Sequence, residues 1–143
     1  MASFQKYFVT TNTTTTQACI EIIAGTIPFF LRQIDVTLTS AVASVLTIGK
    51  PAAMGITPTA PSPIPSIDGP GTSFSQATRA LAWATSPTQP TNGVDHFVFP
   101  ATIGSFKSLA WEPKAFRILP GQSLVLFNVG VVGTFNVTVR IDE

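Results

Sequence analysis

The sequence predicts an all-β protein: a single antiparallel β-sandwich, jelly-roll-like, with roughly eight to ten short strands and one long Pro-rich loop or arm. Apolar and polar residues alternate with a period of two in nearly every ordered stretch, and β-branched residues are frequent there. Pro and Gly separate these stretches, and no segment sustains the apolar spacing of a helix. Short strands and turns without alternating helices favour a sandwich over a parallel sheet.

The expected strands follow from this alternation. The first two are expected at residues 4–10 and 18–23. Residues 33–39 and 134–142 alternate most clearly, which is typical of strands with one buried face. Residues 124–127 are apolar on both faces and predict a fully buried strand. Shorter strands are expected at residues 45–48, 80–85, 97–99, 106–111 and 115–119.

Turn signals lie between the expected strands. Leu119-Pro120-Gly121-Gln122 places Pro and Gly at the two central positions of a type II turn. The dipeptide at residues 92–93, Asn-Gly, is a tight-turn signal, and glycines at 130 and 133 allow a reversal before the last strand.

The segment from about residue 50 to 76 does not fit a compact sandwich. It is rich in Pro and Gly, and a connection of about 25 residues without its own strands usually means function or disorder. One interpretation is an ordinary surface loop. The other is an extended arm that lies on a neighbouring subunit, with isoleucines as apolar anchors. The candidate partner contacts on this arm are Ile56, Ile64, Ile67, Pro61, Pro63 and Pro65.

The arm interpretation makes a specific prediction about two of these isoleucines. Ile64 and Ile67 then belong to no strand or helix in which they are buried. Replacing both by Ser is expected to leave the isolated fold intact and to weaken attachment to a partner. A polar tract over residues 10–16 also lacks an apolar face and belongs with the expected contact regions.

Length and composition bound the class of protein. A chain of 143 residues suits one domain, residues 1–143, with its own core. With 45% hydrophobic and 10% charged residues, it lacks the composition of a disordered protein. The formal charge of +1 at pH 7 argues against nucleic-acid binding. We also expect no membrane association and no secretion, because neither a long apolar stretch nor a signal-peptide pattern is present.

Side chains that carry chemistry are scarce. Cys19 is the one cysteine and His96 the one histidine, so the chain offers no disulfide framework and no multi-histidine metal site. His96 follows Asp95 in an expected strand, where adjacent residues point to opposite faces and form no dyad. Asp68 precedes Gly69 and suits a turn better than a calcium site, because no further carboxylates follow at ligand spacing. We therefore expect no enzyme activity, no metal and no cofactor.

Five sequence blocks with strand and turn signatures cover most of the chain after residue 50: GITP at 55–58, AWATSPTQPTN at 82–92, FPATIG at 99–104, PGQSLVLFN at 120–128 and VRIDE at 139–143. Together these blocks resemble small β-sandwich virion proteins of tailed bacteriophages. The resemblance implies a capsid decoration or cement protein, which binds the outside of the head and clamps neighbouring major capsid proteins. It further implies a homotrimer, a location on the capsid surface and no catalytic residues.

Two tryptophans leave an alternative function open. Exposed tryptophans on a β-sandwich stack against sugar rings in many carbohydrate-binding modules. On this alternative the protein is a glycan-binding module of a virion or tail, with Trp83 and Trp111 as stacking residues. Trp83 shares a face with Leu81, and Trp111 shares one with Leu109, which favours packing in the core instead.

Overall fold

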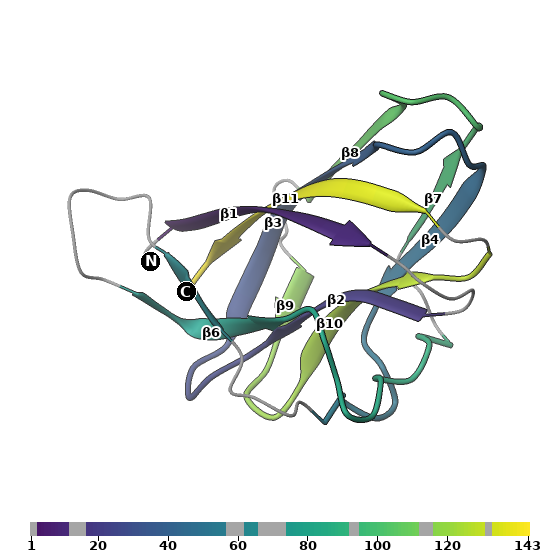
Figure 1. Ribbon diagram of the computed structural model, residues 1–143. Helices are drawn as coiled ribbons and strands as arrows, with labels where there is room; N and C mark the ends of the chain where they lie inside the picture. The colour runs from purple at the N-terminus through teal and green to yellow at the C-terminus, as the bar shows by residue number, and fades with distance from the viewer. Residues whose placement is uncertain are drawn as a thin grey trace.

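The computed structural model describes residues 3–11, 17–56, 62–65, 74–91, 95–111, 116–130 and 133–143. These residues form two antiparallel sheets packed as a β-sandwich, and they contain no helix (Figure 1). Accordingly, the described part of the chain includes no helix that is long and apolar enough to cross a membrane. The strands are β1 (Ser3–Thr11), β2 (Gln17–Ile23), β3 (Phe29–Leu38), β4 (Ser44–Gly49), β5 (Ser62–Pro65), β6 (Phe74–Ala80), β7 (Asp95–Phe99), β8 (Phe106–Ala110), β9 (Phe116–Ile118), β10 (Ser123–Asn128) and β11 (Thr134–Asp142).

The strands pair as a long antiparallel ribbon that is rolled up on itself. β1 pairs with β11, β2 with β10, β3 with β8 and β9, and β4 with β7, so the pairs are nested in the sequence. Rolling adds the pairs β11–β3 and β10–β4. Sheet A then has the order β1-β11-β3-β8, with β9 also on β3, and sheet B has the order β5-β6-β2-β10-β4-β7. Without β5, β6 and β9 this is the eight-stranded order of a jelly roll, as the sequence predicted.

The core lies between the inner faces of the two sheets. In β11 every second residue is buried, which confirms the predicted alternation, and these residues are Phe135, Val137, Val139 and Ile141. β10 is buried along its whole length because its outer face is covered as well. There Val125 and Phe127 form a small second cluster with Ala18, and Trp83 packs against it.

A β-bulge divides β3 into two halves. Arg140 of β11 pairs with Gln33, but the next residue, Ile141, pairs with Leu31, so Arg32 is an extra residue in β3. A bulge re-aims side chains and increases the local twist. The bulge changes which positions of β3 face the core. Before it the inward-facing residues are Phe29 and Leu31, and after it they are Ile34, Val36 and Leu38.

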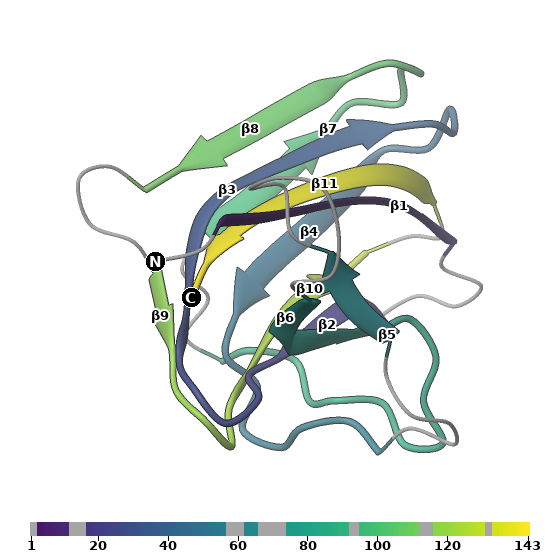
Figure 2. The same cartoon turned by 90° about the vertical axis from the view of Figure 1, so that its left-hand side faces the viewer.

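The long connection between β4 and β7 lies at the tip of the rolled ribbon and returns over sheet B. Its strands β5 and β6 extend the sheet beyond β2. Residues 50–56 and 81–91 run side by side below β2 and β10 (Figure 2), joined by the bridge of Ile56 with Thr85 and by a 3.0 Å hydrogen bond from Thr88 N to Ala53 O. The prediction of a strand over 80–85 was wrong, because the strand ends at Ala80 and only Thr85 forms a bridge beyond it.

The predicted type II turn is present. Gly121 has φ of 77°, and Gln122 N donates a 3.0 Å hydrogen bond to Leu119 O. The turn joins β9 to β10 and thereby passes the chain from sheet A to sheet B.

Candidate functional site

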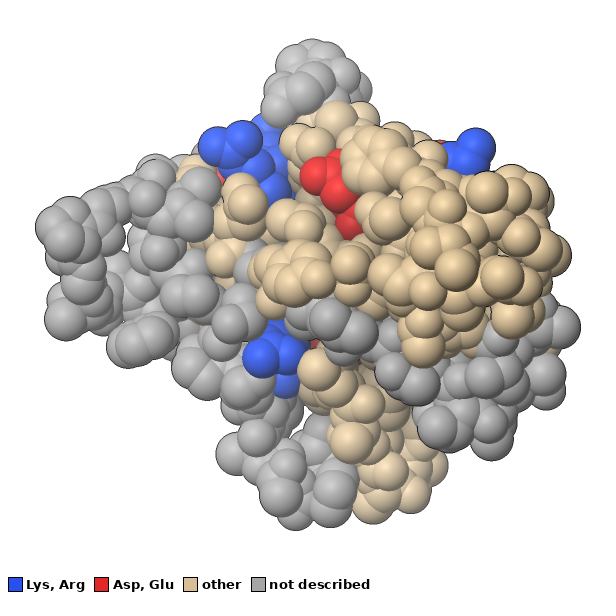
Figure 3. All heavy atoms as spheres, turned by 45° about the horizontal axis from the view of Figure 1, so that its top comes forward, with Lys and Arg blue, Asp and Glu red and all other residues tan. Residues whose placement is uncertain are grey.

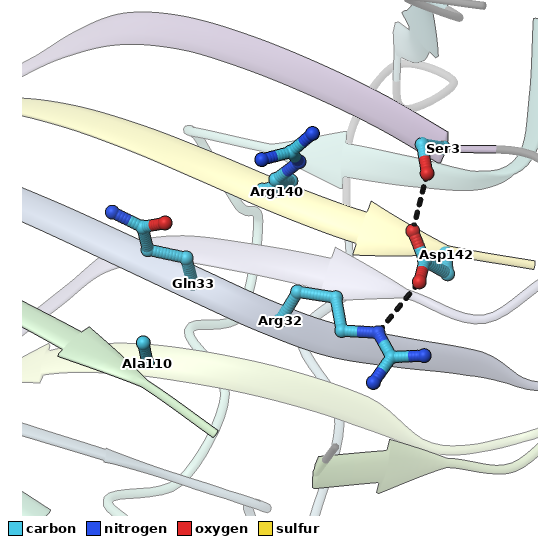
Figure 4. Close-up of a pocket in the computed structure, with 6 residues that line it drawn as sticks. All are labelled: Ser3, Arg32, Gln33, Ala110, Arg140 and Asp142. Atoms are coloured by element: carbon cyan, nitrogen blue, oxygen red, sulfur yellow. Dashed lines mark hydrogen bonds and ion pairs between the residues drawn. The ribbon is translucent and has the colours of Figure 1, made fainter. Parts of the chain in front are cut away.

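The bulge in β3 opens a hollow on the outer face of sheet A. Strand residues normally alternate between faces, but the extra residue lets Arg32 and Gln33 face outward side by side. The hollow has a volume of about 440 Å³, within the range of small-molecule sites. We call it the bulge pocket; its lining residues are Ser3, Arg32, Gln33, Ala110, Arg140 and Asp142 (Figure 4).

One wall of the bulge pocket is a fixed ion pair. Arg32 Nε donates to Asp142 Oδ2 at 2.5 Å, and Ser3 Oγ donates to Asp142 Oδ1 at 2.7 Å. Burial raises the pKa of Asp142, but the hydrogen bonds from Ser3 and Arg32 and the charges of Arg32 and Arg140 outweigh it. Together they hold the pKa of Asp142 below 3.8, its ordinary value. Asp142 is therefore a carboxylate at neutral pH, and it holds the Arg32 side chain in place.

The other wall is a second polar chain. Gln33 Nε2 donates to both carboxylate oxygens of Asp35, at 3.0 and 3.1 Å, and Ser108 Oγ also donates to Asp35. A smaller hollow of about 100 Å³ continues from the bulge pocket, sharing Gln33 and Arg140 with it. The guanidinium of Arg140 is exposed and donates no hydrogen bond to any other residue of the described part. Arg140 is thus a cation available to a ligand.

Charge is concentrated around this pocket. The chain has 8 Lys and Arg and 7 Asp and Glu, yet two of each sign lie on this one sheet face: Arg32, Arg140, Asp35 and Asp142. Figure 3 shows basic and acidic side chains side by side in a view where most described atoms belong to uncharged residues. The residues of the pocket carry balanced charge, which favours ligands with both polar and charged groups.

A buried carboxylate fastens the β4–β7 connection to sheet B. Glu21 of β2 is fully buried, and its carboxylate accepts hydrogen bonds from Ser123 Oγ at 2.6 Å, Trp83 Nε1 at 2.8 Å and Gly55 N at 3.1 Å. All the partners needed by a buried carboxylate are therefore supplied within the protein. This cluster is structural, because it joins β2 and β10 to both segments of the connection.

Three exposed apolar side chains lie along the stretch that joins the two sheets at one edge, with Val98 on the outer face of sheet B and Phe106 on the outer face of sheet A. β7 ends sheet B and β8 ends sheet A on the same side, and the turn between them joins the two sheets (Figures 1 and 2). Val98, Ile103 and Phe106 on this stretch are 60%, 65% and 58% exposed. We call residues 95–110 the β7–β8 edge. Among the described residues, no further strand pairs with its outer side.

The candidate arm residues that the structure describes differ in their placement. Ile64 lies in β5, is 1% exposed and belongs to the main core, so the expectation that it has no strand to be buried in was wrong. A side chain buried in the core does not contact a partner. Ile56 is exposed at the bridge with Thr85. Pro63 and Pro65 lie in β5, whereas Pro61 and Ile67 lie outside the described residues.

The two tryptophans are both packed against the protein. Trp83 is half-buried over the Val125 and Phe127 cluster, and its indole N–H is bonded to Glu21. Trp111 packs against the core and stacks on Phe116, with ring centroids 6.4 Å apart. Neither ring stands free, so the geometry does not support sugar stacking at these positions.

The remaining candidates for chemistry stay apart. His96 Nδ1 lies 2.7 Å from Thr47 Oγ1, and Asp95 accepts a hydrogen bond from the His96 backbone rather than from its ring. This agrees with the prediction that the two side chains form no dyad. Cys19 is buried, and Asp68 lies outside the described residues. Within the described ranges, no group of three or more His, Cys, Asp and Glu side chains is placed to hold a metal ion.

Sequence reasoning missed the bulge pocket. A signal was present, because the inward phase of β3 changes between Leu31 and Ile34, and that change marks an extra residue. The sequence does not show which strand lies beside this point. Comparison of the chain with known protein families, curated proteins and solved structures found no match.

Proposed function

We propose that this protein is a non-catalytic structural component of a phage particle, of the capsid decoration type, and that it attaches to the shell through the β7–β8 edge. The observation that carries the proposal is the exposure of Ile103 and Phe106 beside the unpaired edge of sheet A, and of Val98 on the unpaired edge strand of sheet B. Exposed apolar side chains beside an unpaired strand edge are typical of an interaction surface.

The chemistry of this edge suits a protein partner. Covering each of the three apolar side chains contributes about 1–2 kcal/mol before ordering costs, because each is already partly buried. The outer backbone of β7 and of β8 is available for hydrogen bonds to a strand of another chain. Lys107, exposed in β8, limits unspecific pairing because a lysine on an edge strand disfavours it.

The jelly-roll order and the sequence blocks described above support the same assignment. A decoration protein that binds the finished shell better than free shell subunits stabilises the particle by mass action. On this proposal the partner is the major capsid protein, the location is the capsid surface, and the protein acts as a homotrimer whose symmetry brings the edges to equivalent sites. We expect the free protein to sediment as a trimer, with three times the monomer mass of 15.1 kDa.

The test compares two matched changes. The first is the double variant Ile103→Ser and Phe106→Ser on the β7–β8 edge; the second is Ile56→Ser, at a residue that is 63% exposed but lies on the β4–β7 connection. Both are expected to keep the far-UV circular dichroism of the parent, because the replaced side chains are exposed. Binding is measured by co-sedimentation with undecorated capsids assembled from the major capsid protein of the same phage.

The edge variant is expected to lose attachment and the Ile56 variant to keep it. Loss with Ile56→Ser alone would move the contact to the β4–β7 connection and contradict the edge assignment. If the parent itself fails to bind such capsids, the proposed function is wrong.

A further inference from the structure

We propose that the bulge pocket binds a sugar that carries a carboxylate, such as a hexuronic acid unit of an acidic glycan. This site lies on the outer face of sheet A and does not depend on the proposed function. It also differs from the sugar site considered on sequence grounds, because neither Trp83 nor Trp111 lines the bulge pocket.

The first argument is the pair of guanidinium groups. Arg32 uses Nε to bind Asp142, and Figure 4 shows its two terminal nitrogens turned away from that carboxylate. Arg140 stands across the pocket on β11 and has no hydrogen bond to another described residue. Guanidinium groups bind carboxylates through paired, charge-assisted hydrogen bonds. Both arginines line the same hollow, and Arg140, which donates to no carboxylate of the described part, provides the site for an anionic group.

The second argument is the presence of acceptors beside these donors. Because Gln33 Nε2 is occupied by Asp35, the amide is oriented, and its oxygen lies on the side nearer Arg140 (Figure 4). The Thr138 hydroxyl and the Asp35 carboxylate line the adjoining hollow. Acceptors of this kind bind hydroxyl groups, which a sugar ring supplies in several directions. The pocket therefore matches a ligand that combines one carboxylate with several hydroxyls.

The charge balance distinguishes this ligand from a phosphate. Asp35 and Asp142 offset the charges of the two arginines, and these carboxylates repel a doubly charged anion more strongly than a singly charged one. Phosphate at neutral pH also has few O–H donors for the acceptors of the wall. A singly charged carboxylate with neutral hydroxyls meets both conditions.

The third argument is an apolar surface beside the pocket. Tyr7 of β1 pairs with Thr138 of β11 on the same outer face, one row from Arg140, and is 55% exposed. An exposed tyrosine ring supplies a flat surface for the C–H face of a sugar, and its hydroxyl remains in water. Together the ring and the pocket offer contacts to more than one unit of a chain.

The experiment titrates the intact protein with trigalacturonate and with the trimethyl ester of the same trisaccharide, in which all three carboxylates are neutral. Binding is followed by chemical-shift changes in ¹⁵N-labelled protein. The variant is Arg140→Gln, at an exposed residue, and the control is Lys107→Gln, which removes an exposed positive charge from the same sheet outside the pocket. Equal unfolding midpoints of the three proteins establish that the fold is retained.

We expect the acid to bind with shifts confined to residues of the bulge pocket, the adjoining hollow and Tyr7, and the ester to bind at least about ten-fold more weakly. Arg140→Gln is expected to weaken binding of the acid by about ten-fold or more, and Lys107→Gln to leave it unchanged. Equal binding of the ester, or unchanged binding by Arg140→Gln, would overturn the proposal. So would competition by inorganic phosphate at equal affinity, which would show an anion site without sugar recognition.

Discussion

Ile64→Ala tests directly whether the Pro-rich segment is part of the fold. Ile64 of β5 is 1% exposed and belongs to the main core, so the change removes buried atoms and introduces no polar group. Loss of three methylene-sized groups at about 0.8 kcal/mol each gives about 2.4 kcal/mol, and the remaining cavity raises the cost. We expect a decrease of about 2–5 kcal/mol in the free energy of unfolding, measured by urea denaturation followed by tryptophan fluorescence.

The matched control is Ile56→Ala in the same segment. Ile56 is 63% exposed, so its truncation is expected to change stability by less than about 0.5 kcal/mol. In a chain of this length 1 kcal/mol corresponds to about 3 °C in Tm, which separates the two variants clearly in a thermal scan. Equal stability of the two variants would show that residues 62–65 do not belong to the core in solution, and would restore the interpretation of the segment as an arm.

Two further predictions concern the anchor at Glu21 and the ion pair of Asp142. In Gly55→Ala the added methyl group would overlap Trp83 and lie 2.7 Å from Glu21 Oε2. We expect this variant to lose about 1–3 kcal/mol of its free energy of unfolding and to show a red shift of tryptophan emission. Gly130→Ala is the control and should show neither change, because the nearest atom to its added methyl group is 3.8 Å away. Because the pKa of Asp142 is lowered by folding, its stabilising effect is present above 3.8 and is lost as the pH falls through the folded-state value. Urea titrations at neutral and acid pH should show about 1 kcal/mol of this loss in the parent, and an Asp142→Asn variant with the same pH dependence would contradict it.

Most of the sandwich could be predicted because its strands each have one buried face. The alternation in β3 and β11, the two-sided burial of β10 and the type II turn at Gly121 are local properties of the sequence, and the structure confirms them. The sandwich class followed from the number and shortness of the strands, whereas the order in which they pair depends on contacts between distant residues.

The Pro-rich segment was predicted less well because prolines hide its strand character. Only one side chain of β5 has a described position in the core, Ile64, and a single buried residue produces no alternation in the sequence. Similarly, Trp83 lies in no strand and is positioned by the carboxylate of Glu21. Nothing in the order of residues shows that these two side chains meet across 62 positions of the chain.

The bulge pocket was missed for a related reason. Arg32 and Gln33 face the same side because β11 has one residue fewer at this point than β3. The change of phase is visible in β3 alone, but Arg140 and Asp142 come from the other end of the chain. The pocket residues are brought together by the register of β3 with β11, which the sequence of β3 alone does not specify.

The nested pairing also determines when the sheets can form during synthesis. β1 pairs with β11 along its whole length, from Ser3 opposite Asp142 to Thr11 opposite Thr134. Because β11 lies between β1 and β3, sheet A has no continuous hydrogen bonding until the last of its strands has left the ribosome. At about 5–20 residues per second, β1 and β3 remain without this partner for on the order of ten seconds. During that interval the growing chain exposes strand edges to its neighbours, and it is most prone to aggregate before β11 emerges.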